Sequence, residues 1–157
     1  MSEERPRQFA TLYLASDHAG FAYKEAVKEW LSAENFLVID AGAEAFDGED
    51  DFPDFVIPAV GAMVGDREGE AGAIVFGGSG QGEAMAANRV KGARAVVYYG
   101  GNKTIPTLGR EHNAANVLSI GARFVTIDEA KEAIWNWLHT EPLHEEKYAR
   151  RNQKLDW

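Results

Sequence analysis

Short apolar runs alternate along the chain with longer segments in which apolar residues recur every three or four positions. Five runs have the length and composition of strands, at 9–15, 36–39, 71–76, 93–99 and 117–120. The segments with helical periodicity lie at 21–31, 53–63, 83–89, 103–112, 127–138 and 145–155. We expect an interruption near Pro106 in the fourth of these helices, because proline lacks the N–H of a helical turn.

The order of these elements indicates a fold class. Strands separated by helices of ten or more residues pair in parallel through right-handed crossovers. Near-continuous apolar strands fit a sheet that helices cover on both faces. The pattern therefore predicts an α/β fold, a three-layer α/β/α sandwich around a five-stranded parallel, Rossmann-like sheet. At 157 residues the chain can bury one core, so we expect a single domain over 1–157.

Composition narrows the chemistry available to the chain. The absence of cysteine excludes disulfides, thiolate metal ligands, thiol redox chemistry and cysteine nucleophiles. A formal net charge of −9 argues against nucleic-acid partners, whose phosphates attract a basic surface. Residues 1–8 are polar and no apolar stretch is long enough to span a bilayer, so we expect a cytoplasmic protein with no membrane partner.

The negative charge is concentrated in the first part of the chain. Residues 1–66 hold 14 acidic and 4 basic residues, whereas residues 67–157 hold 11 acidic and 12 basic residues. Much of the excess lies around Gly48, in Asp47, Glu49, Asp50 and Asp51. We interpret this segment as a solvated loop. A metal site is the alternative, but the spacing does not match a calcium-binding loop, and we predict no metal.

Polar clusters beside the strands are the candidates for a site, because ligands of open parallel sheets bind beyond the carboxyl ends of the strands. We expect three clusters there: residues 16–18 after the first strand, residues 77–82 after the third, and residues 110–113 leading to the fifth. Taken singly, His18 and His112 could be ordinary loop histidines. Their polar neighbours, Asp17 and Asn113, favour a functional site.

The segment 77–82 holds four of the 16 glycines and precedes a helix. Its backbone N–H groups can therefore approach an anion without obstruction by side chains, although a tight packing turn is the alternative. It lacks the P-loop lysine and the GxGxxG spacing, so both nucleotide fingerprints fail. Glu83 follows in the first helical turn, where an acidic residue can simply complement the helix dipole. A role as base requires burial, because the dipole lowers the pKa of this carboxyl.

The C-terminal segment 147–154 holds four of the 16 basic residues. Lys147 and Arg151 are four residues apart and share one helix face, which suits chelation of a phosphate. An ordinary solvated helix end is the alternative.

Together these motifs resemble those of the type B ribose-5-phosphate isomerases and the related galactose-6-phosphate isomerases. The resemblance extends from the first strand to the last helix, and its motifs lie at 16–21, 51–54, 77–83, 86–89, 110–113 and 121–123. It implies a cofactor-free aldose–ketose isomerase that interconverts ribose 5-phosphate and ribulose 5-phosphate through an enediolate. The alternatives are the same chemistry on a tetrose or hexose phosphate and, in another class, a non-catalytic module that binds a sugar phosphate.

The resemblance also implies roles for individual residues. Many family members place a cysteine base where Gly77 stands, and a subgroup uses a glutamate at the position of Glu83, which this chain matches. His112 would open the sugar ring, and Asp17 would handle hydroxyl protons. Backbone N–H groups of 79–82, with Asn113, would stabilise the enediolate. The catalytic residues implied are Asp17, Ser79, Glu83, His112 and Asn113.

The substrate-binding residues implied are His18, Gly78, Gly80, Gly82, Arg123, Lys147 and Arg151. The basic ones among the phosphate ligands would come from a partner subunit, so the resemblance implies a homodimer with shared active sites, or a tetramer of such dimers. The helix at about 142–157 would pack on the partner. Three departures concern the substrate: Lys147 replaces an arginine, Phe52 replaces a tyrosine, and segment 99–107 is about two residues longer than usual.

Overall fold

The computed structural model of the protein describes residues 5–156. Its centre is a sheet of the strands β1 (Thr11–Ser16), β2 (Leu37–Asp40), β3 (Ala71–Gly77), β4 (Ala95–Tyr98) and β5 (Val117–Gly121). The strand order is β2-β1-β3-β5-β4, and every neighbouring pair is parallel. The predicted fold class is therefore confirmed.

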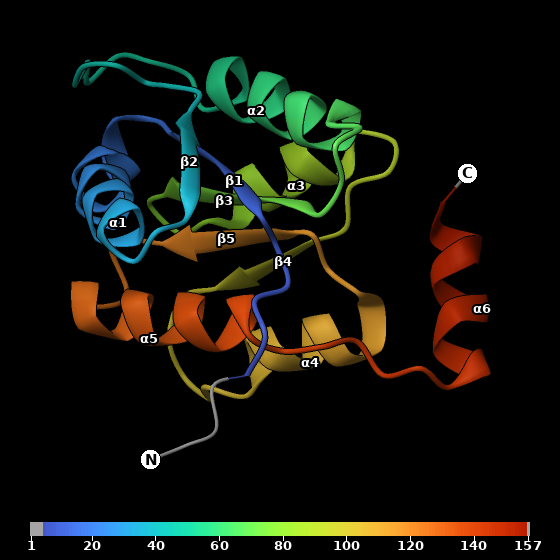
Figure 1. Cartoon of the computed structure of the whole chain (residues 1–157). Coiled ribbons are helices and arrows are strands. Elements are labelled where there is room, and N and C mark those ends of the chain that lie inside the picture. The colour runs from blue at the N-terminus through green and yellow to red at the C-terminus, as the bar shows by residue number, and fades with distance from the viewer. Residues whose placement is uncertain (1–4, 157) are drawn as a thin grey trace.

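Helices cover both faces of this sheet (Figure 1). One face carries α2 (Pro53–Gly65) and α3 (Gln81–Asn88), and the other carries α1 (Phe21–Ala33), α4 (Ile105–Asn113) and α5 (Ile127–Leu138). A short 3-10 turn, η1 (His18–Gly20), leads from β1 into α1. The three layers follow from the apolar strands, which have both faces to bury.

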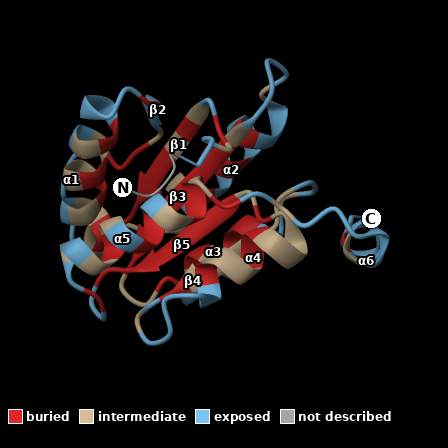
Figure 2. Cartoon of the chain, turned by 60° about the horizontal axis from the view of Figure 1, so that its bottom comes forward, coloured by how far each residue is buried: buried red, intermediate tan, exposed pale blue. Residues whose placement is uncertain are grey.

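Strand β3 shows how the two cores are divided. Ile74 and Phe76 pack with the core under α1 and α5, whereas Ala73 and Val75 pack with the core under α2 and α3. Because successive strand residues point to opposite faces, a strand buried on both sides is apolar at nearly every position. The central strands β1, β3 and β5 are buried along most of their length (Figure 2).

Helix α4 corrects one expectation. It begins at Ile105, with Pro106 in its first turn, and continues to Asn113 without interruption. Proline is tolerated in a first helical turn, because the N–H groups there have no helical acceptor. The predicted break near Pro106 is therefore wrong, and the helix starts two residues later than expected.

Helix α6 (Glu146–Leu155) stands apart from the sheet, beyond the end of α4 (Figure 1). Its contact with the rest of the chain includes Asn152, whose amide donates to the His112 carbonyl at 3.1 Å and accepts from Asn113 Nδ2 at 3.2 Å. Arg94 also pairs with Asp156, at 2.8 Å. Trp157, the last residue of the predicted C-terminal segment, lies outside the described residues. In the part of the chain from 5 to 156, no helix has the length and apolar character needed to cross a membrane.

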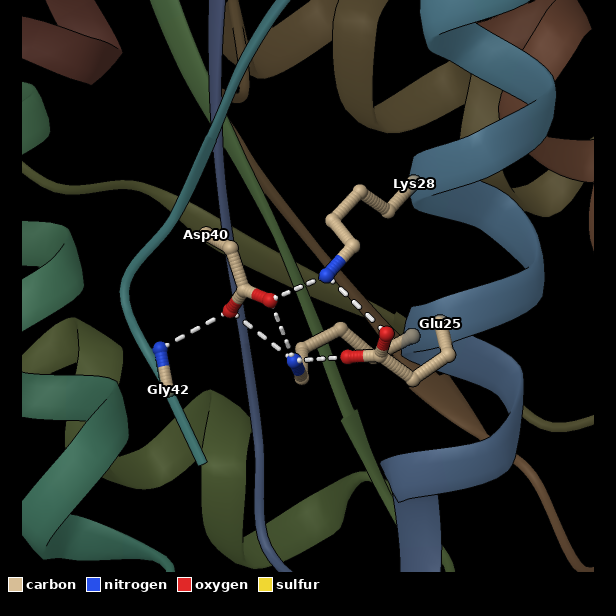
Figure 3. A network of polar contacts seen from close by, with 5 residues as sticks. Glu25, Lys28, Asp40 and Gly42 are labelled. Atoms are coloured by element: carbon tan, nitrogen blue, oxygen red, sulfur yellow. Dashed lines mark hydrogen bonds and ion pairs between the residues drawn. The ribbon is translucent and has the colours of Figure 1, made fainter. Parts of the chain in front are cut away.

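A buried ion-pair network joins α1 to the end of β2 (Figure 3). Lys24 has no exposed side-chain surface and donates to both carboxylate oxygens of Asp40 and to Glu25, each at 2.8 Å. Lys28 donates to Asp40 at 2.8 Å, and the Gly42 N–H donates to the same carboxylate at 3.0 Å. The network therefore holds the start of the acidic segment 41–52 against α1.

We expect Asp40→Asn to destabilise the protein by about 3 kcal/mol at pH 7, because it leaves the buried Lys24 ammonium with less compensating charge. Burial raises the pKa of Asp40, but the hydrogen bonds from Lys24 and Lys28 outweigh it and hold the pKa below its ordinary value of 3.8. Because its pKa is lower in the folded state, the ionised Asp40 carboxylate stabilises the fold above pH 3.8. This contribution is lost as the pH falls through the folded-state pKa. In urea unfolding, the difference in the free energy of unfolding between wild type and Asp40→Asn should therefore become smaller below pH 3.8.

The matched control is Glu25→Gln, whose side chain is 37% exposed. This substitution should lower the free energy of unfolding by no more than about 1 kcal/mol, as for other solvent-accessible ion pairs. Equal decreases in the free energy of unfolding for the two variants at pH 7 would show that Asp40 stabilises the fold no more than Glu25 does.

Candidate active site

Strands β1, β3 and β5 end side by side at one edge of the sheet. Their register pairs Ser16 with Phe76, and Gly77 with Gly121. The segments that follow these strands therefore meet, as expected for the clusters at 16–18 and 77–82. The strand order also reverses here, since the chain passes from β1 to β2 on one side and to β3 on the other, which is where open α/β sheets bind ligands.

Asp17 follows β1 and is held firmly by backbone groups. Its Oδ1 accepts hydrogen bonds from the N–H groups of Ala19, at 3.0 Å, and Gly20, at 3.3 Å. Gly20 lies so close to β3 that a Cβ on it would overlap the backbone of Phe76. The carboxylate of Asp17, on a residue only 7% exposed, is thus pinned at the strand edge, and its Oδ2 takes no part in these bonds.

The glycine-rich segment 77–82 is tied to the end of β5. The N–H groups of Ala122 and Arg123 donate to the carbonyls of Gly77 and Gly78, at 2.8 and 3.0 Å. Ser119 Oγ donates to the Gly80 carbonyl at 2.6 Å. These bonds make the segment a rigid part of the sheet edge.

Two glycines permit this close approach. Gly80 has φ +77°, a left-handed conformation, and a Cβ on Gly121 would meet the Ser79 carbonyl oxygen at 2.5 Å. Ser79 Oγ accepts from the Gln81 N–H at 3.3 Å at the start of α3. The first N–H groups of a helix have no helical acceptor, so the start of α3, including Gly82, offers backbone donors to an anion.

Glu83 lies in the first turn of α3 and is only 4% exposed. Its carboxylate occupies the space beside Gly77: a Cβ on Gly77 would overlap both carboxylate oxygens. Burial raises the pKa of Glu83 above its ordinary value; its own backbone N–H lowers it, and the charge of Asp17 raises it further. The burial that a base at this position needs is therefore present.

Arg123 lies on the same side of the sheet. A Cβ on Gly78 would be 3.2 Å from Arg123 Nη1, so this exposed guanidinium extends over the glycine-rich segment of its own chain. The expectation that the basic phosphate ligands come from a partner subunit is therefore wrong for Arg123, because the turn after β5 is bonded to Gly78 within the chain.

His18 is paired with Asp50, a residue that sequence reasoning missed. Asp50 Oδ1 lies 2.7 Å from His18 Nδ1 and accepts the His18 backbone N–H at 2.9 Å. The Asp50 side chain is 8% exposed. The expectation of a solvated acidic segment is therefore wrong at this residue. Which of its four neighbouring acidic residues turns inward depends on the path of the loop, and no local pattern encodes that path.

The side chains of Asp17, His18 and Asp50 also have the spacing of a metal site, with one ligand atom of each within 4.8 Å of the others. Two of the three are already paired directly, through a hydrogen bond between His18 Nδ1 and Asp50 Oδ1. This arrangement suits a proton shared by the pair.

His112 and Asn113 lie at the opposite edge of the sheet, which corrects the expected position of the cluster at 110–113. Helix α4 runs back antiparallel to the strands, so its C-terminus returns to the edge where β5 begins. There the Ala115 N–H bonds to Gly109, and the Asn116 N–H bonds to Arg94, just before β4. A segment that leads from a helix into a strand of a parallel sheet lies at the amino edge, so the order of α4 and β5 along the chain already indicates this position.

Helix α6 brings the remaining basic residues to this second cluster. The His112 ring stacks on Tyr148 with a centroid separation of 4.9 Å and an interplanar angle of 8°. Both basic residues on α6, Lys147 and Arg151, are exposed. Lys147 Nζ lies 3.6 Å from Glu145 Oε2. A groove of about 340 Å³ separates α6 from the end of α4. Within one chain, His112, Asn113, Lys147 and Arg151 thus lie away from Glu83.

The fold and the first cluster define an α/β domain in which a glycine-rich loop offers backbone N–H donors beside a buried carboxylate. The description Ribose/Galactose Isomerase belongs to the family model that matches residues 12–155. The chain belongs to this family.

The relatives found by sequence and by structure agree with this assignment. Ribose-5-phosphate isomerase B of Mycolicibacterium paratuberculosis is 39% identical over 145 residues, covering 92% of this chain and 87% of the relative. The Mycoplasma genitalium ribose-5-phosphate isomerase B, solved with bound ribulose-5-phosphate, has a TM-score of 0.85 and 32% identity, covering 92% and 93% of the two chains. The enzyme of Anaplasma phagocytophilum has a TM-score of 0.87 at 30% identity, covering 96% and 99%.

Proposed function

We propose that this protein interconverts ribose 5-phosphate and ribulose 5-phosphate without a cofactor. The observation that carries the proposal is the carboxylate of Glu83, buried over Gly77 beside the backbone donors at the start of α3. A base of raised pKa next to anion-stabilising N–H groups is what proton abstraction beside a carbonyl requires. The similarity to an isomerase solved with ribulose-5-phosphate supports the choice of a pentose phosphate.

The chemistry is a pair of proton transfers on the open-chain sugar. Glu83 removes the proton from C2, the C2–H electrons form a C1–C2 double bond, and the carbonyl oxygen on C1 becomes an enediolate oxygen. Backbone N–H groups of 79–82 stabilise this charge. Asp17 transfers the O2 hydroxyl proton to O1, and Glu83 returns its proton to C1, which yields the ketose with all atoms conserved.

The phosphate and ring-opening groups come from two places in the chain. His18 and Arg123 lie at the carboxyl edge with Glu83, whereas His112, Asn113, Lys147 and Arg151 lie at the opposite edge. We infer a homodimer in which α6 packs on the partner and completes the partner's site, because the second cluster cannot reach Glu83 of its own chain. Since sugar phosphates carry charge and do not diffuse across membranes, we propose a cytoplasmic location.

The shared site predicts complementation between two inactive variants. Glu83→Gln inactivates the part of each site that one subunit supplies, and His112→Ala inactivates the part that the partner supplies. After unfolding and refolding of an equal mixture, a mixed dimer contains one site with both residues intact. Random pairing should therefore restore about a quarter of wild-type activity, whereas each variant alone stays inactive. Mixed dimers seen by native mass spectrometry without activity would contradict sharing.

The substrate itself is tested by kcat/KM for four-, five- and six-carbon aldose phosphates. We expect ribose 5-phosphate to have the highest value. A higher kcat/KM for a tetrose or hexose phosphate would show that the protein isomerises that sugar phosphate instead. Absence of turnover and of solvent deuterium exchange with every candidate would favour the non-catalytic binding module.

A further inference from the structure

We propose that Asp50 is a positioning residue for phosphate recognition, because it orients the His18 imidazole and stabilises its cationic form for a hydrogen bond from Nε2 to the phosphate. This rests on the proposed function insofar as it takes His18 as a phosphate ligand. The pairing of His18 with Asp50 is independent of that function.

The geometry fixes which ring nitrogen faces the ligand side. Asp50 Oδ1 accepts from the His18 backbone at 2.9 Å and lies 2.7 Å from Nδ1, so the residue is held at two points by one oxygen. With Nδ1 turned to Asp50, only Nε2 remains for a ligand. A neutral imidazole with its proton on Nδ1 presents a lone pair at Nε2, which repels a phosphate oxygen, and only the cation presents a donor there.

The surroundings of Asp50 make His18 its natural counterion. Asp50 Oδ2 is buried and has no hydrogen-bond partner within residues 5–156, and the whole side chain is 8% exposed. A carboxylate removed from water in this way requires a nearby positive charge. Protonated His18, bonded to the other oxygen, supplies it.

The loop that carries Asp50 is anchored where it starts. Gly42 accepts the Ser16 N–H at 2.9 Å, and the Ala43 N–H donates to the Ser16 carbonyl at 3.0 Å. The Asp40 network described above holds the same turn against α1 (Figure 3). Because Ser16 directly precedes Asp17 and His18, the loop and the site are fastened together.

Charged groups from three segments act on His18. The hydrogen bond to Asp50 is the largest influence and raises the pKa of His18; partial burial lowers it, the charges of Asp17 and Asp50 raise it, and Arg123 lowers it. The net direction is upward from 6.5. Phosphate binding should therefore be strong below the folded-state pKa of His18 and should weaken as the pH rises through it.

Asp50→Asn is the sharpest variant, because it keeps an oxygen acceptor and removes the charge. Inhibition by inorganic phosphate and the KM for ribose 5-phosphate, measured from pH 6 to 9, report binding. We expect phosphate binding to weaken about tenfold at pH 8 and to remain near wild type at pH 6, with kcat changed by no more than about twofold. Glu49→Gln removes one exposed charge from the same loop and should match wild type at every pH. A pH-independent loss in Asp50→Asn would overturn the proposal.

Two further measurements separate this proposal from the proposed function. In a His18→Gln background, Asp50→Asn should cause no additional loss of phosphate binding, since its effect acts through His18. The His18 ring signal, assigned by its disappearance in His18→Gln, should titrate at higher pH in wild type than in Asp50→Asn by NMR. This readout needs no turnover. If Asp50→Asn does not fold, the wild-type titration decides: a midpoint at or below 6.5 overturns the proposal.

Discussion

Glu83→Gln is expected to lower kcat by about 10²–10⁴-fold while the KM for ribose 5-phosphate stays within about threefold of wild type. The amide has the shape of the carboxylate but cannot accept a proton from C2, so the substrate still binds and the chemical step fails. Steady-state kinetics and solvent deuterium incorporation into the sugar measure the two effects separately. Wild-type turnover in a verified variant would refute the assignment of Glu83 as base.

The raised pKa of Glu83 adds two signatures that a structural role would not produce. The base must be ionised, so kcat should fall as the pH is lowered through a pKa above the ordinary 4.5 of a glutamate. A pKa raised by folding means that the fold loses stability as the pH rises through the folded-state pKa. Glu83→Gln should therefore have a higher Tm than wild type at pH 8 and no advantage at pH 4. Glu68→Gln, at an exposed position, should change neither Tm nor kcat.

Gly77→Ala is expected to lower kcat by about 10²-fold, although it adds only a methyl group. That methyl would overlap both carboxylate oxygens of Glu83, so the carboxylate must move from its position beside the backbone donors. Displacing a reacting group by about 1 Å costs about this factor in rate. The variant therefore tests whether the space beside Gly77 admits a single side chain, that of Glu83.

Gly61→Ala is the matched control for this substitution. Gly61 lies in α2, and a Cβ there would meet no atom within 4 Å. Alanine at such a helical position should preserve kcat and raise the free energy of unfolding by up to about 1 kcal/mol. Full activity in Gly77→Ala would contradict the position assigned to the Glu83 carboxylate.

The fold was predictable because its signals are local. Apolar runs of strand length, such as 71–76, separate segments of helical period, and this alternation leaves few topologies other than a parallel sheet covered on both faces. The glycine-rich segment and Glu83 were recognisable in the same way, from their place between a strand and a helix. Pro106 misled the prediction because a proline is read as a helix breaker, although its effect depends on whether it stands in the first turn or later.

The sequence by itself thus determined the strands, the helices, the backbone anion loop and the acidic residue beside it, all of which depend on the period and order of residues along one segment. Only the tertiary structure decided that Asp50 turns inward to His18 and that Arg123 extends over Gly78. These are relations between segments far apart in the chain. They depend on how loops and helices pack across the sheet, and the periodicity of any single segment carries no information about such distances.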